Sequence, residues 1–292
     1  MSKDEVIIML QRRSSNNQRR GPRISLGRIL IALLIAGISI ITYMASSEFN
    51  PITEETQQVA LSKEEEVALG LQAAPEMAQM HGGLHPDVNV QTYVDNICKN
   101  LIRSSAVSET EWPFECHVLA DNETVNAFAL PGGQIFITAA LFNDLESKGQ
   151  VAGVMAHEMG HVVARHAAEQ MAEQQLAQGL SGAAVIAAYD PENPNSGLTT
   201  QQFAALISSL VTLKYGRDDE LQSDQLGVRF MADAGYDPRA MVRVMEILSQ
   251  VDRPGMAPEF FSTHPNSENR ITRILEAIQT LYPNGVPEGL KS

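Results

Sequence analysis

The residues His157-Glu158-Met159-Gly160-His161 place two imidazoles and a carboxylate inside an otherwise apolar run. On a helix, side chains four positions apart lie on the same face, so His157 and His161 can reach one zinc ion together. Glu158 lies beside them, where a carboxylate suits a general base that polarises a zinc-bound water. The spacing therefore predicts a metal site built on a helix.

The residues around this motif, 149–156 and 162–165, are mostly apolar on the predicted helix. A buried helix that carries histidine and glutamate needs partners for them, because polar side chains are costly in a dry interior. The alternative is a surface helix that happens to carry these residues. The apolar surroundings favour a buried metal helix.

A third ligand is required, because tetrahedral catalytic zinc binds three protein groups and a water. A metzincin would continue with glycine and histidine three and six positions after His161, where this chain has Ala164 and Ala167, and His166 is out of register. Glu169 lies about 12 Å further along the helix, whereas zinc–ligand bonds are about 2 Å. The third ligand is expected from another segment.

Glu220 is the best candidate for that ligand, and it lies in a helix-like stretch over residues 215–227. Asp224 shares its face one turn later, where it can accept a hydrogen bond from the far nitrogen of a zinc-binding histidine and fix the ring tautomer. Without the histidine motif, such a pair of carboxylates is more typical of a solvated helix face.

Four features follow one another in a fixed order across residues 60–280. They are Asn126-Ala127-Phe128-Ala129-Leu130-Pro131-Gly132-Gly133, the histidine motif, Glu220 with Asp224, and His264-Pro265 followed by Arg270-Ile271. On these features the chain resembles the membrane-associated zinc metallopeptidases of family forty-eight, which include CAAX prenyl proteases, HtpX and Oma-type proteases. The resemblance implies several membrane spans in the prenyl protease and HtpX branches. This chain departs from them, because its apolar residues 180–188 are too few to cross a membrane.

The resemblance implies a role for each matching residue. The implied zinc ligands are His157, His161 and Glu220, with Glu158 as catalytic base and Asp224 as support. His264 is implied to help stabilise the oxyanion of the tetrahedral intermediate, as an imidazole N–H near developing negative charge can do. Arg270 has two interpretations at this stage: it orients His264 or the substrate, or it is an exposed residue that opens a helix over 269–281.

Three short strands are predicted over residues 114–120, 126–130 and 134–138, with a tight turn between the last two. The strand 126–130 is expected to border the cleft and to bind an extended peptide through main-chain hydrogen bonds. Asn126 and Phe128 are therefore candidate substrate residues. Packing is the alternative role for Phe128 and Phe136.

The fold class predicted from these elements is α+β, a mainly helical zincin-like metallopeptidase domain with a small β-sheet. Helices are expected over 62–80, where Ser62 and Glu65 suit a capping box, and over 199–214, 218–233 and 238–251. The loop 190–197 is expected as a mobile lid near the cleft.

The N-terminal residues differ sharply in charge from the rest of the chain. Residues 1–28 carry seven basic and two acidic side chains, for a net charge of +5, whereas the remaining 14 basic and 33 acidic side chains give −19. An acidic catalytic domain argues against binding of nucleic acid. Residues 29–45 have no charge and span roughly 25 Å as a helix, just enough for a bilayer.

This apolar segment is expected to anchor the protein in the cell membrane as a single pass. The basic residues before it place the N-terminus in the cytoplasm and the catalytic domain on the extracytoplasmic, periplasmic side. A cleaved signal peptide is the alternative. The expected segments are a basic cytoplasmic segment 1–28, the anchor or signal peptide 29–45, a polar linker 46–61, the metallopeptidase domain 62–284 and a tail 285–292.

Cys98 and Cys116 are the two cysteines. In an oxidising compartment they can form a disulfide across a short loop, and two buried free thiols are an equal alternative.

These observations predict a Zn²⁺-dependent endopeptidase that binds one ion per chain and hydrolyses peptide bonds in misfolded or unassembled envelope proteins. Its partners would be protein or peptide substrates and the membrane. The competing hypothesis is a chaperone-like assembly or binding factor whose zinc site is structural or latent, since a structural zinc is normally closed by a fourth protein ligand.

Overall fold

The computed structural model describes residues 26–188, 215–250, 259–265 and 269–292. The expected lid loop 190–197, the expected helix 199–214 and most of the basic segment 1–28 lie outside the described residues. The chain forms two compact units, of which one comprises Met1–Thr42 and Leu176–Val211 and the other Tyr43–Gln175 and Thr212–Ser292.

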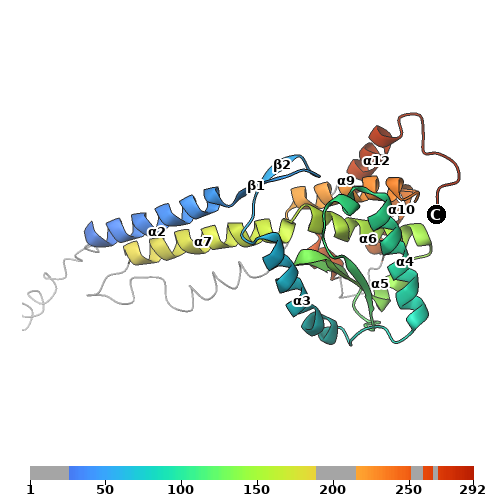
Figure 1. The fold of residues 1–292 in the computed structure, drawn as a ribbon, viewed down its shortest axis with the longest axis horizontal. Helices are drawn as coiled ribbons and strands as arrows, with labels where there is room; N and C mark the ends of the chain where they lie inside the picture. The colour runs from blue at the N-terminus through green and yellow to red at the C-terminus, as the bar shows by residue number, and fades with distance from the viewer. Residues whose placement is uncertain (1–25, 189–214, 251–258, 266–268) are drawn as a thin grey trace, which may run out of the picture. The chain divides into compact units, whose positions relative to one another are not determined.

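The first unit contains most of helix α2 (Leu26–Ala45) and the end of helix α7 (His166–Ala188). Within this unit the two helices lie side by side (Figure 1), and a Cβ atom on Gly179 would fall 2.0 Å from the Ser39 hydroxyl oxygen. Helix α2 is long and apolar enough to cross a membrane and exposes most of its large apolar side chains. It begins three residues earlier than the expected anchor 29–45 and ends at the same residue.

The second unit holds a three-stranded sheet with the order β3-β5-β4. Its strands are β3 (Glu115–Leu119), β4 (Ala127–Leu130) and β5 (Gln134–Thr138), and this confirms the three predicted strands. All residues of β5 are buried, as a central strand requires, and it pairs parallel with β3 and antiparallel with β4. Strand β4 therefore forms an edge of this sheet.

The second unit also contains helix α6 (Lys148–Val163), which is shown in yellow-green in Figure 1, and further helices. The others are α3 (Lys63–Met80), α4 (Val88–Ser104), α5 (Ala139–Asp144), α9 (Arg217–Asp233), α10 (Arg239–Gln250), α11 (Phe260–Thr263) and α12 (Arg270–Leu281), with 3₁₀ turns at η1 (Ala106–Glu109) and η2 (Pro131–Gly133). Helices α3, α9, α10 and α12 confirm the predictions for 62–80, 218–233, 238–251 and 269–281, apart from residue 251, which is not described. The predicted Ser62–Glu65 capping box is present at α3.

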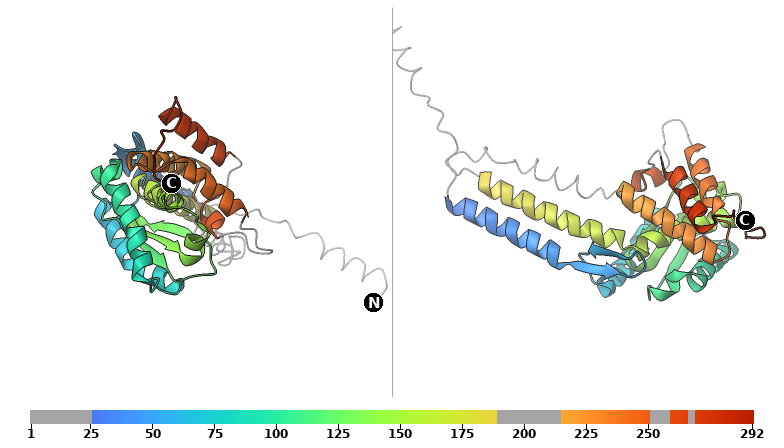
Figure 2. Two further views of the ribbon diagram at one scale, coloured as in Figure 1. Left: turned by 90° about the vertical axis from the view of Figure 1, so that its right-hand side faces the viewer. Right: turned by 90° about the horizontal axis from the view of Figure 1, so that it is seen from above.

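Helix α6 lies at the centre of this unit and contacts the sheet, α4, α9 and α10 (Figures 1 and 2). Every residue from Gly149 to Val163 is buried, so the apolar run that surrounds the histidine motif does form a core helix. The surface-helix alternative is wrong for this reason.

The turn between β4 and β5 packs directly on α3. Gly132 has a φ of 79°, and a Cβ at this position would lie 2.4 Å from the Val67 Cα atom. Only glycine tolerates both this backbone conformation and this close contact. Gly70 on α3 faces Pro131 in the same way, with 2.0 Å between its ideal Cβ and the proline carbonyl oxygen.

The expected polar linker 46–61 instead contains an antiparallel hairpin of β1 (Ser47–Asn50) and β2 (Glu55–Gln58). The hairpin is ordered by polar contacts with the end of α6: the Asn50 amide donates to the Val163 carbonyl at 2.8 Å, and the Gln57 amide donates to the Ala164 carbonyl. Arg165, which has a φ of 56°, donates to Glu48 on β1. These long-range bonds give the segment a structure that its polar composition did not predict.

The expected tail 285–292 also returns to the fold. The Lys291 backbone pairs with Gly235 and Asp237, and its ammonium group donates to the Ala234 carbonyl at 3.0 Å. The end of α9 is thereby covered by the last residues of the chain.

A disulfide joins Cys98 on α4 to Cys116 on β3, so the disulfide alternative is the one that the structure supports. Both cysteines are buried in the core. The sequence separation is 18 residues, and closing a loop of that length is worth about 3 kcal/mol.

We expect the unreduced protein to show no free thiol when it is unfolded in denaturant and titrated with a thiol reagent. Replacing both Cys98 and Cys116 by alanine should lower the free energy of unfolding by about 3 kcal/mol, because the unfolded chain regains its loop entropy. Urea denaturation of the wild type and of the double variant measures the difference. Two titratable thiols per unreduced chain would contradict the disulfide.

Candidate active site

Helices α6 and α9 pack unusually closely at the histidine motif. A Cβ atom on Gly160 would lie 2.7 Å from the Ser223 hydroxyl oxygen and 2.9 Å from its carbonyl oxygen. The Ser223 hydroxyl donates to the His157 carbonyl at 2.9 Å. The absence of a side chain at Gly160 therefore lets α9 approach α6, and the serine bond fixes how the two helices are aligned.

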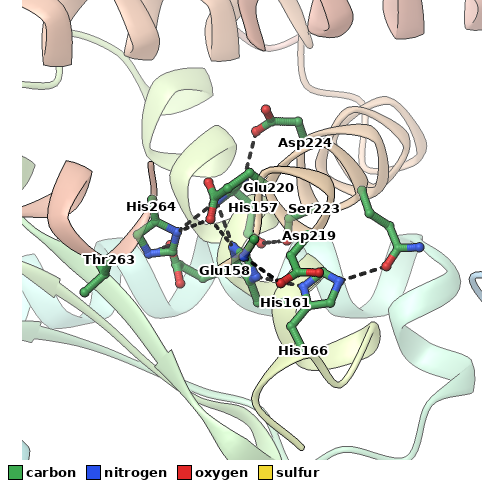
Figure 3. A network of polar contacts seen from close by, with 12 residues as sticks. His157, Glu158, His161, His166, Asp219, Glu220, Ser223, Asp224, Thr263 and His264 are labelled. Atoms are coloured by element: carbon green, nitrogen blue, oxygen red, sulfur yellow. Dashed lines mark hydrogen bonds and ion pairs between the residues drawn. The ribbon is translucent and has the colours of Figure 1, made fainter. Parts of the chain in front are cut away.

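Four buried side chains direct their donor atoms to one point (Figure 3). His157 and His161 come from α6, Glu220 comes from α9, and His264 follows the short helix α11. One ligand atom from each lies within 4.8 Å of all the others. The structure thus brings together the three residues expected to bind metal and adds His264 as a fourth donor.

The distances between several of these donors are close to those expected around a bound zinc ion. Bonds of about 2.0–2.1 Å to a tetrahedral ion place neighbouring ligand atoms about 3.3–3.4 Å apart. Nε2 of His157 lies 3.1 Å from Nε2 of His161, 3.5 Å from a Glu220 oxygen and 3.4 Å from Nδ1 of His264. The other Glu220 oxygen lies 3.3 Å from Nε2 of His161 and 3.0 Å from Nδ1 of His264. Nitrogen and carboxylate donors at this spacing suit zinc.

The charges in the cluster also fit a divalent cation. Glu158, Glu220 and Asp224 are buried together with one fixed cation, Arg270. When all three carboxyl groups are ionised and the imidazoles are neutral, the cluster has an excess of two negative charges. Buried charge needs compensation, and a bound divalent ion would supply it.

Asp224 and Arg270 contact the donor residues and orient them. Nδ1 of His157 lies 2.9 Å from the Asp224 carboxylate, as predicted for a carboxylate that orients the ring. Arg270 contacts Asp224 with two nitrogens, at 2.8 and 2.7 Å, and Glu220 with a third at 2.7 Å. Its side chain is 1% exposed, so the interpretation of Arg270 as an exposed helix-opening residue is wrong, and its guanidinium orients the two carboxylates.

The pKa values reflect this concentration of acidic groups. Burial lowers the pKa of His157, but hydrogen bonds to Asp224 and Glu220 outweigh burial and raise it to about 9. Burial raises the pKa of Glu220, but the surrounding histidines hold it well below its usual value. The carboxylates therefore favour positive charge at the point where the donors meet.

Glu158 is fully buried next to the donor cluster, and neither of its carboxylate oxygens has a hydrogen-bond partner among the described residues. Burial raises its pKa. One oxygen lies 3.6 Å from Nε2 of His264. A buried carboxyl group without a partner is costly, so this group has the properties of a proton acceptor placed for chemistry.

The segment that carries His264 connects the cluster to the start of strand β4. The Phe260 ring stacks on the His264 ring with 4.4 Å between centroids, and the Phe260 backbone N–H donates to the Val125 carbonyl at 3.2 Å. Asn126 is the next residue, and its buried side-chain oxygen has no hydrogen bond within the part of the chain that the structure describes. The beginning of β4 therefore lies next to the site.

Phe128 has the packing role that was its alternative interpretation. Its ring stacks on Phe136 at 5.1 Å and contacts His81 at 5.6 Å. Within the described part of the chain, no hydrogen bond or ring contact joins Phe128 or Asn126 to the donor cluster. Their proposed roles in binding substrate remain predictions.

Two neighbours of His161 were not assigned a role from the sequence. The Tyr215 ring stacks on the His161 ring with 3.9 Å between centroids, and Nδ1 of His166 lies 2.9 Å from Nδ1 of His161. Its spacing from His161 excludes His166 as a metal ligand. The signal that identifies it is the need for a hydrogen-bond partner at Nδ1 of His161.

We expect replacement of Arg270 by methionine to destabilise the metal-free protein by about 3–5 kcal/mol, because two buried carboxylates lose their counter-charge. Arg273→Met is the matched control on the same helix. Arg273 forms an exposed pair with Glu276 at 2.8 Å, and its loss should cost less than about 1 kcal/mol. Urea denaturation in the presence of chelator measures both. Equal stability of the two variants would contradict the buried role of Arg270.

The comparisons with known proteins agree with this geometry. The model of Peptidase family M48 matches residues 89–278. The chain is similar to "Mitochondrial metalloendopeptidase OMA1" of Schizosaccharomyces pombe, with 31% identity over 250 residues, which are 85% of this chain and 71% of that protein. It is also similar to "Beta-barrel assembly-enhancing protease" of Escherichia coli, with 28% identity over 187 residues, 61% of this chain and 37% of that protein. Since the family model covers well over half of its length, the chain belongs to Peptidase family M48, a family of metallopeptidases.

Proposed function

We propose that the protein is a zinc metalloendopeptidase with His157, His161 and Glu220 as the metal ligands and Glu158 as the catalytic base. The observation that carries the proposal is the set of four converging donors beside a buried carboxyl group whose two oxygens have no hydrogen bond to any described residue. A buried carboxyl group without a hydrogen bond lowers the stability of the fold, so its presence is better explained by a catalytic role than by a structural one.

Zinc would supply the Lewis acid that acidifies a water molecule and polarises the scissile carbonyl. Glu158 would accept the proton from the attacking water and deliver it to the leaving amine. Asp224 holds the His157 ring through its Nδ1 atom, and Arg270 holds Asp224 and Glu220 in turn. His264 has a second nitrogen 3.6 Å from Glu158, close to where an oxyanion would develop.

His264 takes the fourth position of the donor set, the position that a catalytic zinc site leaves open for solvent or substrate. In a peptidase this position must admit water, so His264 would have to act beside the ion and not as its ligand. The same observation favours the second candidate function, a binding or assembly factor whose zinc is structural. A test of the function must therefore measure turnover as well as metal content.

Strand β4 is the proposed platform for the substrate. It is an edge of the three-stranded sheet, and Val125, two residues before it, is bonded to the segment that carries His264. An extended peptide could add to this edge through main-chain hydrogen bonds, which do not depend on the side chains of the peptide. Such binding suits unfolded segments of many proteins, and it fits the proposal that the substrates are misfolded or unassembled envelope proteins.

We expect Glu158→Gln to retain bound zinc but to lower hydrolysis of a disordered protein by about 10²–10⁴-fold, because the amide cannot accept the proton. Glu173→Gln, an exposed carboxylate on α7, is the matched control and should cleave like the wild type. The measurements are gel-based cleavage rates and zinc content per chain. Chelator should abolish cleavage by the wild type, and added zinc should restore it.

Two results would separate the candidate functions. Chelator-sensitive cleavage that disappears in Glu158→Gln supports the peptidase. Stoichiometric zinc with no cleavage of any disordered protein by the wild type would instead support the binding factor.

We further propose that α2 anchors the protein with residues 46–292 on the extracytoplasmic side. Protease added to intact spheroplasts should then degrade this part and leave an N-terminal tag protected. Protection of the catalytic part would contradict the orientation, and a mature N-terminus near Glu48 would replace the anchor by a cleaved signal peptide.

A further inference from the structure

The two imidazoles of the histidine motif are supported in different ways. Nδ1 of His157 faces the buried carboxylate of Asp224 at 2.9 Å. Nδ1 of His161 faces another imidazole, that of His166, at 2.9 Å. An imidazole can either donate or accept a hydrogen bond at this nitrogen, so the support of His161 depends on what fixes His166.

A chain of hydrogen bonds continues outward from His166. Its Nε2 atom lies 2.8 Å from the Gln222 side-chain oxygen, and the Gln222 side-chain nitrogen lies 2.6 Å from the Glu55 carboxylate. His166 begins α7, Gln222 lies on α9 and Glu55 begins β2 of the hairpin. All of them belong to the second unit. Figure 3 shows the inner part of this chain beside the donor cluster.

The outer end of the chain determines the direction of every bond in it. The Glu55 carboxylate only accepts, so the Gln222 nitrogen must face it and the Gln222 oxygen must face His166. His166 then carries its hydrogen on Nε2 and has a lone pair on Nδ1, which accepts from Nδ1–H of His161. Nε2 of His161 is left with its lone pair directed at the donor cluster. This is the tautomer that a metal ligand requires.

The His166 side chain is buried, with 1% exposure, so water does not compete for the two hydrogen bonds of its ring.

We propose that His166, Gln222 and Glu55 are positioning residues that set the ring orientation and tautomer of His161, so that the docked hairpin contributes to metal affinity. This inference rests on the proposed zinc site. A purely structural role is the competing explanation, and it would affect stability alone, because Asn50, Gln57 and Arg165 attach the hairpin to the end of α6 independently of Gln222.

The test measures the zinc dissociation constant of the full-length protein in detergent by competition with a chromophoric chelator. His166→Leu removes the acceptor and should raise the dissociation constant by about 10–100-fold, the usual cost of losing such a partner. His166→Asn places an amide oxygen near the former Nδ1 position and should keep the affinity close to that of the wild type. The absorption spectrum of the Co²⁺-loaded variants provides a second readout of ligand geometry.

The outer links are tested with Gln222→Met and with the double variant Gln222→Glu, Glu55→Gln. The methionine removes both polar atoms and should weaken zinc binding. The double variant still presents an acceptor to His166 and a donor–acceptor pair to the hairpin, so it should bind zinc like the wild type. Glu54→Gln, an exposed neighbour in the same hairpin turn, is the matched control and should change nothing.

Native-like affinity of His166→Leu, or equal losses in His166→Leu and His166→Asn, would overturn the inference. If His166→Leu does not fold, Gln222→Met decides, because Gln222 is only partly buried. Unchanged zinc affinity of folded Gln222→Met would then overturn the inference, and weakened affinity would support it. Failure of the wild type to bind zinc would contradict the proposed function itself, so the two failures are distinguishable.

Discussion

The structure depends on one constraint: a helix buried along almost its whole length carries two imidazoles and a carboxyl group into the core. Polar side chains in such a place destabilise the fold unless other groups compensate for the lost water. The neighbouring elements provide that compensation: α9 supplies two carboxylates, α12 a guanidinium, and the segment after α11 a third imidazole. The packing of these elements against α6 therefore both stabilises the fold and forms the site.

The short distances between the donors require close packing, and a single residue permits it. With no side chain at Gly160, the backbone of Ser223 lies against α6, and the serine hydroxyl bonds to the His157 carbonyl. This contact also fixes the rotation of α9. A shift of one residue would turn the helix by about 100° and would direct both Glu220 and Asp224 away from the cluster. The geometry of the metal site thus follows from a packing contact that contains no ligand.

Local sequence patterns predict the helices and strands that have periodic apolar residues. They do not predict elements that are held by polar contacts between residues far apart in the sequence. Periodic apolar residues and turn residues predict α6, α9 and the three-stranded sheet. The hairpin has two strands of four mostly polar residues, and its order comes from carbonyl groups more than 100 residues away. For Arg270 the sequence leaves two interpretations open, an orienting role or an exposed position, until Asp224 and Glu220 are placed beside it. The sequence does not predict His264 as a fourth donor, because the residues before it carry no motif that fixes its position relative to α6.

The unequal support of the two imidazoles has a consequence for how the site responds to its surroundings. Asp224 is buried and is held by Arg270, so the orientation of His157 is insulated from solvent. The support of His161 ends at Glu55, an exposed residue of a hairpin that begins two residues after the end of α2. Exposed hydrogen bonds are weaker and open more readily than buried ones. A local opening of the hairpin would therefore release the tautomer of His161 while His157 and Glu220 keep their geometry.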